Sequence, residues 1–337
     1  MKFKTKIDLI DMEHKVFDIK NESMPKGAWW WWFWLFFFNN PKNPEKPRQL
    51  MILWSTKNEK EIYCNNLKLK LKPSKDRSNL SGAVAAWYFD GEKMHHNFLL
   101  EQCDIKVSDK EISSNSNTPT SFSINKSKNI IKIGNEFEFI AEATNKHNFI
   151  KPTFESNNYI KKIGYSTLRL NYLNLKGKVK NKSINGSAYF QRIFVNSPLP
   201  PWYWGVFHFK NGSVLTYFNP NLLGKSIKKD IKFFDKNEVH EFNDIDVKKS
   251  GENIPIFTVV GENDNEKINF TVNSYSHSSW TFNKKSFGII PTKLVYNEYP
   301  AIISDFNLLN KDTGKIIDTE KLGKAVGNSE HTTGILI

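Results

Sequence analysis

Cysteine and the short motifs of common catalytic sites are what this sequence has least of. Its 337 residues include two cysteines, Cys64 and Cys103, and no Cys-x-x-Cys pair. Two cysteines permit one disulfide, but they exclude a disulfide scaffold and a cysteine-based zinc site. No phosphate-binding loop, Gly-x-Ser-x-Gly elbow or His-Glu-x-x-His motif is present. These absences argue against nucleotide hydrolysis, an α/β-hydrolase triad and zinc-dependent proteolysis.

Long hydrophobic runs are also missing. The longest apolar run has eleven residues, Ala28 followed by the segment Trp29–Phe38, whereas a membrane-spanning helix needs about 20. The N-terminus begins Met-Lys-Phe-Lys-Thr-Lys and continues into Asp8, Asp11 and Glu13 without an apolar segment, so no signal peptide is expected. The expected location is the cytoplasm, either free or in loose contact with an anionic membrane.

The run from Trp29 to Phe38 is nearly all aromatic and is the most informative segment. A continuous apolar run of this length is typical of a strand buried on both faces. Such a strand would present large flat side chains, as a pocket for a long apolar or polyene molecule requires. Trp30, Trp32 and Trp34 are therefore candidate substrate-binding residues.

The charge balance is strongly basic, with a formal net charge of +13 and a pI of about 9.4. Such a charge is compatible with nucleic acid, an anionic membrane or acidic ligands. The lysines, however, are scattered: Lys68 and Lys70 alternate with Leu67 and Leu69, which is typical of a solvated strand face. Binding of single strands needs lysines interleaved with aromatic residues, and here the two types lie apart. No nucleic-acid partner is expected.

The pattern along the chain is β almost throughout, with no amphipathic helix longer than three turns. The expected strands are Leu50–Thr56, Glu61–Lys72, Ala83–Phe89, Asn97–Val107, Glu136–Ala143, Tyr165–Lys178, Ser187–Val195, Trp202–Phe209, Val214–Phe218, Ile231–Phe234, Ile256–Val260, Lys267–Tyr275 and Ala301–Leu308. Asp90-Gly91, Asn185-Gly186 and Asn211-Gly212 are two-residue turn signals. Regular strands with such turns favour sandwiches or barrels.

Two domains are expected, because single cores stop growing near 250–300 residues. Each half of the sequence starts on a Trp-rich strand, at 29–38 and at 202–209, and ends on a polar strand led by glycine. The Pro-rich segment after Asn196 is typical of a linker. The predicted domains are therefore residues 1–195 and residues 196–337, each a barrel-like unit.

Two expected strands carry candidate binding and catalytic side chains. Alternation places Trp202, Trp204 and His208 on one face, where the histidine could transfer a proton or could be a hydrogen-bonded core residue. On the second strand, the side chains of Tyr189 and Gln191 share one face, and the side chain of Arg192 points to the other face. A buried Gln191 or Arg192 could bind a ligand head group, although an ion pair with a nearby acid explains the arginine equally well.

Further candidates lie near the turns and in the last strand. Tyr217 and Asn219 share a face and could hydrogen-bond a substrate, although Asn219 also precedes a proline and could start a turn. Glu330 would have a raised pKa against aromatic side chains and could act as an acid. Adjacent His95 and His96 diverge on a strand, and without a third ligand no metal site is expected.

These segments resemble a known family. The Trp-rich strand at 29–38, the strand Gly186–Arg192, the Trp-x-Trp strand from Trp202 to Tyr217 and the closing segment at 327–334 occur in the order seen in carotenoid 1,2-hydratases (hydroxyneurosporene synthases). The resemblance extends to the AttH-like proteins, tocopherol cyclases and certain fungal Diels–Alderases of the lipocalin superfamily.

The resemblance implies two lipocalin-like, calycin-type antiparallel β-barrels packed side by side, with an apolar cavity inside or beside the first. It also implies protonation of an alkene to a tertiary cation, stabilised by aromatic faces, with no metal or organic cofactor. Glu330, His208 and Tyr217 are then the candidate catalytic residues. The expected ligand is an isoprenoid or another long apolar molecule.

The sequence departs from the hydratase pattern at two places. The strand that contains Tyr189 lacks the expected His and Asp, and Asn219 stands where the family has an acid. Because asparagine cannot protonate an alkene, Glu330 or His208 would have to replace that acid. Two hypotheses therefore follow from the resemblance: a cofactor-independent hydratase, cyclase or isomerase, and a non-catalytic carrier of an apolar ligand. The third hypothesis, a protein that binds nucleic acid or an anionic surface, predicts a continuous basic face and no enclosed cavity.

Overall fold

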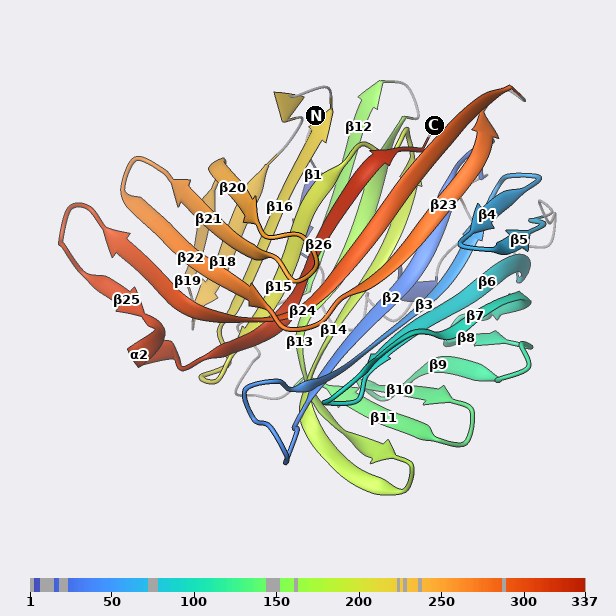
Figure 1. Cartoon of the computed structure of the whole chain (residues 1–337), viewed down its shortest axis with the longest axis horizontal. Helices are drawn as coiled ribbons and strands as arrows, with labels where there is room; N and C mark the ends of the chain where they lie inside the picture. The colour runs from blue at the N-terminus through green and yellow to red at the C-terminus, as the bar shows by residue number, and fades with distance from the viewer. Residues whose placement is uncertain are drawn as a thin grey trace.

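The protein is built from two antiparallel β-sheets, so the all-β expectation is confirmed (Figure 1). The computed structural model describes residues 3–6, 15–17, 24–71, 78–143, 152–160, 163–222, 225–226, 229–235, 238–286 and 289–336. Within these ranges the only named helix, α2 (Thr319–Leu322), has four residues. None of the described helices is long and apolar enough to cross a membrane.

The first sheet contains most strands of the N-terminal half. Its strands are β1 (Phe3–Lys6), β2 (Trp29–Phe38), β3 (Arg48–Lys57), β6 (Asn79–Phe89), β7 (Met94–Val107), β8 (Glu111–Ser114), β9 (Thr120–Asn125), β10 (Lys128–Ile133), β11 (Phe137–Glu142), β12 (Thr153–Ile160), β13 (Ile163–Val179) and β14 (Lys182–Asn196). Ten of these strands close into a barrel, because β13 pairs with both β11 and β14. Strands β12 and β1 extend the sheet outward from β13.

The second sheet is open, which corrects the expectation of two barrels. Its strands are β4 (Ile62–Cys64), β5 (Leu67–Leu69), β15 (Trp202–Phe209), β16 (Val214–Leu222), β17 (Lys225–Ser226), β18 (Asp230–Asp235), β19 (Glu238–Phe242), β20 (Asp244–Ser250), β21 (Ile256–Glu262), β22 (Glu266–Ser274), β23 (Ser278–Ser286), β24 (Ile290–Asn310), β25 (Ile316–Asp318) and β26 (Ala325–Ile335). Its main path runs from β19 to β20, and these two edge strands are not paired with each other.

Local chain geometry explains the open edge. A single residue, Asn243, separates β19 from β20, and a hairpin needs at least two connecting residues. The two strands therefore cannot fold back onto each other. The sheet nevertheless curls around its own core. Gly261 of β21 lies close to side chains of β18 and β19, since a Cβ built on it would lie 2.8 Å from Ile231 Cδ1 and 3.1 Å from Phe242 Cβ.

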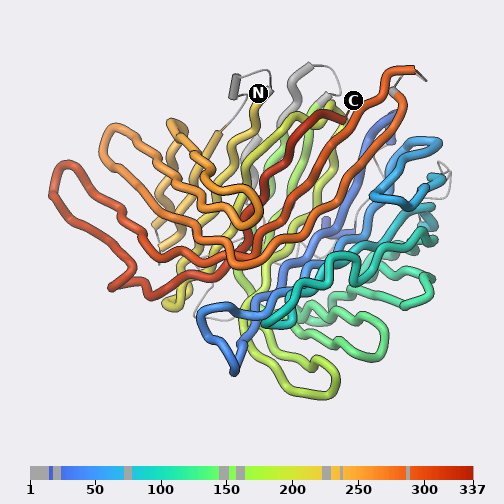
Figure 2. Tube along the Cα trace, in the orientation of Figure 1, coloured from blue at the N-terminus to red at the C-terminus, as the bar shows by residue number. Residues whose placement is uncertain are grey.

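The chain changes sheets between Asn196 and Trp202, where β14 ends and β15 begins. One segment of the N-terminal half joins the second sheet: β4 pairs with β23, and β5 pairs with β4. Figure 2 shows these blue strands beside the orange end of β23. The domain boundary at 195/196 stays a prediction, and the hairpin at 62–69 connects the two halves.

The structure confirms two of the predicted turns and corrects two other predictions about where the chain turns. Gly91 and Gly212 have positive φ values of 105° and 96° at turns, as predicted. The strand expected over 61–72 is instead a hairpin that turns at Asn65, with φ 50°. Asn185-Gly186 lies inside β14, and the turn before that strand uses Lys180 and Asn181, with φ 49° and 65°.

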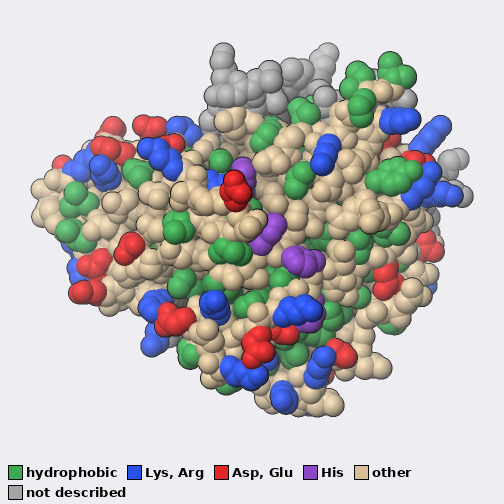
Figure 3. Space-filling view, viewed as in Figure 1, with side chains coloured by type: hydrophobic (Ala, Val, Ile, Leu, Met, Phe, Trp, Pro, Cys, Tyr) green, Lys and Arg blue, Asp and Glu red, His purple; other side chains and the backbone are tan. Residues whose placement is uncertain are grey.

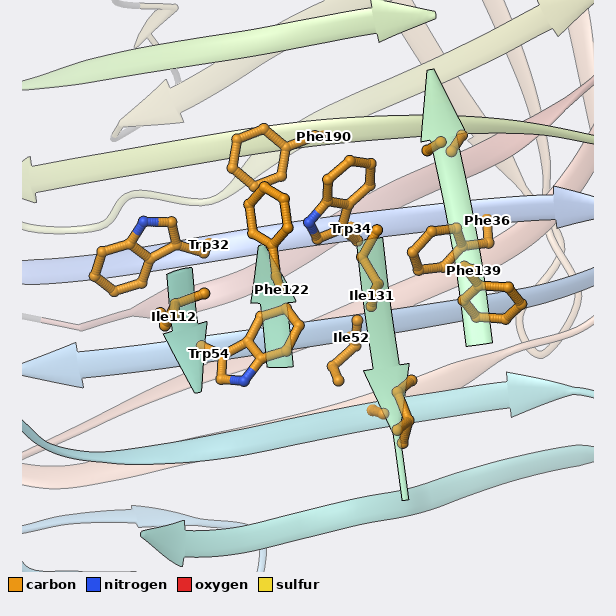
Figure 4. Close-up of a cluster of buried hydrophobic side chains, with 14 of the residues drawn as sticks. Trp32, Trp34, Phe36, Ile52, Trp54, Ile112, Phe122, Ile131, Phe139 and Phe190 are labelled. Atoms are coloured by element: carbon orange, nitrogen blue, oxygen red, sulfur yellow. The ribbon is translucent and has the colours of Figure 1, made fainter. Parts of the chain in front are cut away.

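The aromatic strand β2 lies between β3 and β14 and is buried on both faces, as predicted. Its even-numbered rings enter the barrel core, where Trp34 contacts Phe122 at 5.0 Å and Phe190 at 4.8 Å between ring centroids (Figure 4). Its odd-numbered side chains face the second sheet. We call the buried residues between the two sheets the inter-sheet layer. Phe33 and Trp204 meet there at 6.2 Å.

Candidate functional site

Two glutamates lie directly opposite each other in the second sheet. Strands β24 and β26 pair antiparallel, with Glu298 in register with Glu330. Strand alternation places Asn328 on the same face of β26 as Glu330. Trp204, in register with Glu330 on β15, belongs to the inter-sheet layer. The two carboxyl groups, which we call the carboxyl pair, therefore point toward the first sheet.

The carboxyl pair is almost completely buried, with 0% of Glu298 and 6% of Glu330 exposed. Glu330 accepts two hydrogen bonds, from Tyr296 Oη at 2.6 Å and from Trp202 Nε1 at 3.0 Å. Glu298 Oε2 accepts a hydrogen bond from Asn328 Nδ2. Its other oxygen, Oε1, has no hydrogen-bond partner in the part of the chain that the structure describes. The two acids thus have different surroundings.

Burial and mutual repulsion keep a proton on this pair. Burial, and then the charge of Glu330, raises the pKa of Glu298 well above its ordinary value. Burial also raises the pKa of Glu330 to about 7, against the opposing effect of the hydrogen bonds from Tyr296 and Trp202. Ionising both of two adjacent buried carboxyls has a large free-energy cost. The arrangement therefore favours a protonated Glu298 beside an ionisable Glu330 near neutral pH.

Other polar atoms beside Glu298 lack partners. Ser278 is in register with Glu298 on β23, and both are fully buried. Neither Ser278 Oγ nor Asn328 Oδ1 forms a hydrogen bond within the described residues. An unpaired buried polar atom costs about 1–3 kcal/mol, and two to four such atoms are what a buried water needs. Ser278, Glu298 and Asn328 could therefore hold a water or the polar end of a ligand.

Aromatic side chains surround the carboxyl pair. The Tyr296 ring lies 5.9 Å from Trp202 and stacks on Trp280 at 6.3 Å. The Trp204 ring lies 5.6 Å from Tyr189. Trp202 and Tyr296 are only partly buried, so the aromatic surroundings reach the surface on that side. Ring faces of this kind can stabilise a cation.

Tyr189 and Gln191, which were predicted to share one face of their strand, also lie in the inter-sheet layer. Tyr189 Oη donates a 2.5 Å hydrogen bond to Gln191 Oε1, and Gln191 is in register with Arg169 on β13. Arg169 lies 3.8 Å from Glu155, in an ion pair that is mostly shielded from solvent. The charge of Glu330 acts on Tyr189 and helps burial to raise the tyrosine pKa.

The three candidate catalytic residues do not converge. Glu330 belongs to the carboxyl pair. His208 shares its face of the sheet but lies four residues beyond Trp204, about 13 Å along β15. Its ring nitrogens contact Ser187 Oγ at 2.7 Å and the Asn171 carbonyl at 2.9 Å.

Tyr217 lies on the opposite face of the second sheet from Glu330. It is fully buried in that sheet's own core, where its hydroxyl contacts Ser329 Oγ at 2.6 Å. Asn219 is half-buried near the end of β16. The second sheet therefore separates the Tyr217 side chain from the carboxyl pair.

The candidate binding residues divide into two groups. Trp202, Trp204, Tyr189 and Gln191 face the inter-sheet layer, near the carboxyl pair. Trp30, Trp32, Trp34 and Arg192 point into the barrel core instead. There Trp32 Nε1 donates to the Val16 carbonyl at 2.9 Å. Arg192 lies 4.9 Å over the Trp30 ring and donates to the Lys15 carbonyl, so residues 15–17 close this end of the barrel core.

Four residues of the site were not anticipated from the sequence. They are Tyr296, Glu298, Asn328 and Ser278. Ser278 belongs to a strand that was not expected, and Tyr296 and Glu298 lie in the part of β24 that precedes the expected range Ala301–Leu308. Tyr-Asn-Glu-Tyr at 296–299 carries a glutamate between two tyrosines, which is the one local signal that could have drawn attention to it. Its pairing with Glu330 depends on strand register across more than thirty residues.

Metal-ligating and thiol chemistry find little support in the described residues. No group of three or more His, Cys, Asp and Glu side chains suited to a metal ion occurs there. Cys64 and Cys103 are free and buried, and burial raises the pKa of each thiol to about 12. The one disulfide that the composition permitted is therefore not formed.

Comparison with known proteins identifies the fold. No family model and no curated protein matches the chain. A crystal structure from Nitrosomonas europaea, whose protein is provisionally assigned as AttH, is similar, with a TM-score of 0.55. The alignment covers 94% of this chain and 98% of that one at 12% identity. At this identity the likeness concerns the fold alone.

Proposed function

We propose that this protein binds an isoprenoid or another long apolar molecule against the inter-sheet layer and transforms it by acid catalysis. The reaction would be a hydration, cyclisation or isomerisation that needs no cofactor. The observation that supports this most is the buried carboxyl pair, Glu298 and Glu330, set among the rings of Trp202, Trp204 and Tyr296.

The proposed first step is a proton transfer from Glu298 to a carbon–carbon double bond. The π electrons take the proton, the second carbon becomes a tertiary cation, and Glu298 becomes a carboxylate. A carboxyl whose pKa is raised retains its proton at neutral pH. The new cation would be stabilised by the nearby carboxylates and by aromatic faces, which offsets the cost of charge in an apolar site.

The fate of the cation separates the three reactions. In a hydration, a water held by Ser278 and Asn328 would form the new C–O bond and release a proton to a carboxylate of the pair. In a cyclisation, a second double bond of the substrate would attack the cation instead, and the new cation would lose a proton from a neighbouring carbon to a carboxylate of the pair. In an isomerisation, a neighbouring carbon would lose a proton. Each route returns one proton to the pair, so the acid is regenerated.

A non-catalytic carrier is the second candidate. It is favoured by the almost complete burial of Glu298 and Glu330, because an acid that substrate cannot reach would only maintain structure. The carrier would use the same aromatic residues and would release its ligand unchanged.

The test combines ligand identification with matched variants. Lipid extracted from protein purified from its own host would identify the ligand class by mass spectrometry. That compound would then be incubated with wild type, Glu298→Gln and Glu330→Gln in deuterated water. Acid catalysis predicts deuterium on a substrate carbon and a rate loss on the order of 100-fold or more in Glu298→Gln.

Glu238→Gln is the matched control, because the Glu238 side chain is 74% exposed. It should leave the rate unchanged. Ligand binding without product in any of the proteins would favour the carrier. Full activity in Glu298→Gln would overturn the assignment of the acid.

A further inference from the structure

The outer end of the β23–β24 hairpin exposes large apolar side chains. Ile289 is 80% exposed and Ile290 is 50% exposed, at the start of β24. Exposed isoleucines are common singly, but adjacent ones at a projecting end are a feature of surfaces that contact a partner or a membrane. Figure 1 shows this hairpin projecting from the molecule at the upper right.

A row of basic and amphipathic side chains runs across the same end of the sheet. Four strands place Lys68, Tyr63, Asn283 and Lys293 in successive register, from β5 through β4 and β23 to β24. Lys285 lies two residues nearer the tip than Asn283, on the same face. Lys68, Lys285 and Lys293 are exposed, and so is the Tyr63 ring.

Within the described residues, two of the four lysines in this region are paired with glutamates and two are not. Glu61 pairs with Lys68 at 2.7 Å, and Glu59 is used in a buried pair with Lys284 at 2.5 Å. No ion pair to Lys285 or Lys293 is found in the described residues. Figure 3 shows hydrophobic side chains at this corner, with Lys and Arg side chains beside them. The whole chain carries a formal charge of +13.

We propose that this corner, which we call the basic tip, binds the surface of an anionic lipid bilayer. Ile289 and Ile290 would enter the boundary between head groups and acyl chains. Tyr63 would lie at the head-group level, where amphipathic rings are favoured. Lys68, Lys285 and Lys293 would meet the negative head groups, as basic segments beside a membrane do.

The basic tip and the carboxyl pair share strand β24. Ile290 and Glu298 are eight residues apart on β24, which corresponds to about 26 Å. A bilayer bound at the basic tip would supply an apolar substrate to the carboxyl pair. Only this role as a source of substrate rests on the proposed function. Bilayer binding itself would hold for a carrier as well as for an enzyme.

The first experiment measures sedimentation with vesicles of phosphatidylcholine, with and without phosphatidylglycerol. Wild type should bind the anionic vesicles, and added salt should weaken the binding because it screens the lysines. The double variant Ile289→Asp/Ile290→Asp should lose this binding. Lys285→Glu/Lys293→Glu should weaken it on the order of tenfold or more. Ile316→Asp, which changes an isoleucine that is 39% exposed on β25, should bind as wild type does.

A second measurement does not depend on the stability of the charged variants. Ile289→Cys would be labelled with an environment-sensitive fluorophore, since Cys64 and Cys103 are buried. The emission should shift to shorter wavelength with anionic vesicles, whereas a label at Ile316→Cys should not respond.

Several results would overturn the proposal. One is the absence of vesicle binding by wild type. Others are unchanged binding by the tip variants and a silent label at position 289. Equal binding to vesicles without phosphatidylglycerol would remove the role of the lysines. Self-association that the tip variants abolish, without any vesicle binding, would show that the basic tip contacts a second copy of the chain.

Discussion

Tyr296 donates a 2.6 Å hydrogen bond to Glu330 across the β24–β26 ladder, and Glu298 follows two residues later on the strand that carries the tyrosine. The hydroxyl stabilises the charged form of Glu330 and also lowers the pKa of Glu298, but Glu298 alone has a carboxyl oxygen, Oε1, with no hydrogen-bond partner among the described residues. This asymmetry distinguishes two glutamates of identical chemistry and underlies the assignment of Glu298 as the proton donor.

Replacing Tyr296 with phenylalanine should raise the pKa of Glu330 above its value of about 7. The reason is that the hydrogen bond from Tyr296 is the largest effect that opposes burial at this carboxyl. Titration of carbon-13-labelled glutamate by NMR would measure the change. Tyr299→Phe is the control, because alternation places Tyr299 on the other face of β24. A carboxyl that titrates identically in Tyr296→Phe would refute this role.

Glu298→Gln should change how stability depends on pH. The folded pKa of Glu298 lies above the unfolded value, so the folded protein retains a proton that the unfolded chain releases. Wild-type stability should therefore fall as the pH rises above about 4.5 through the folded pKa, by up to about 1.4 kcal/mol per pH unit from this group. Urea unfolding at several pH values should show a shallower decline in the variant. Equal slopes in the two proteins would contradict the prediction.

Lys57 should have the opposite pH dependence. Its ammonium group lies 4.8 Å over the Trp29 ring and donates to the Gly27 carbonyl at 2.6 Å. Burial, and then the charge of Lys284, lowers its pKa to about 7, although Glu59 opposes the shift. Above pH 7 the unfolded chain binds the extra proton, so this group makes the protein more stable as the pH rises toward 10.5.

Lys57→Met should remove that rise, which amounts to at most about 1.4 kcal/mol per pH unit. Thermal or urea unfolding between pH 7 and pH 10 would measure it. Lys248→Met is the control, since the Lys248 side chain is 80% exposed and should leave the slope unchanged. A slope that survives in Lys57→Met would mean that the amine stays charged in the folded protein.

Much of the fold could be predicted because its signals are local. The apolar run at 29–38 indicated a strand buried on both faces, and β2 has that burial. Alternation placed Trp202 and Trp204 on one face, and both lie in the inter-sheet layer. Asp90-Gly91 and Asn211-Gly212 encode turns in two adjacent residues. Each of these features depends on a few consecutive side chains.

Features that depend on distant strands could not be predicted in the same way. Closure of the first barrel requires β13 to pair with both β11 and β14, and no local pattern in the sequence predicts this double pairing. The carboxyl pair requires the register that puts Glu298 opposite Glu330. Trp30, Trp32 and Trp34 were predicted to bind substrate, but only the tertiary structure shows that their side chains fill the barrel core.

Gly186 shows how a local signal can mislead. Asn-Gly is a strong hairpin signal, yet here both residues lie within β14, and Gly186 is in register with Phe38 of β2. A Cβ built on Gly186 would lie 1.9 Å from the Phe37 carbonyl oxygen and 2.8 Å from Phe38 Cα. The glycine therefore permits the close approach of two strands that help to close the barrel.

Gly186→Ala should consequently destabilise the protein by roughly 1–3 kcal/mol, as strain at a tightly packed position does. The sign of this stability change is informative, because in an ordinary strand interior a change from glycine to alanine stabilises the protein. Urea unfolding would measure the difference. Asn185→Ala, one residue away and exposed, should change stability by no more than about 0.5 kcal/mol. A Gly186→Ala protein as stable as wild type would show that β2 and β14 can separate without loss, and the close contact between them would then have no structural role.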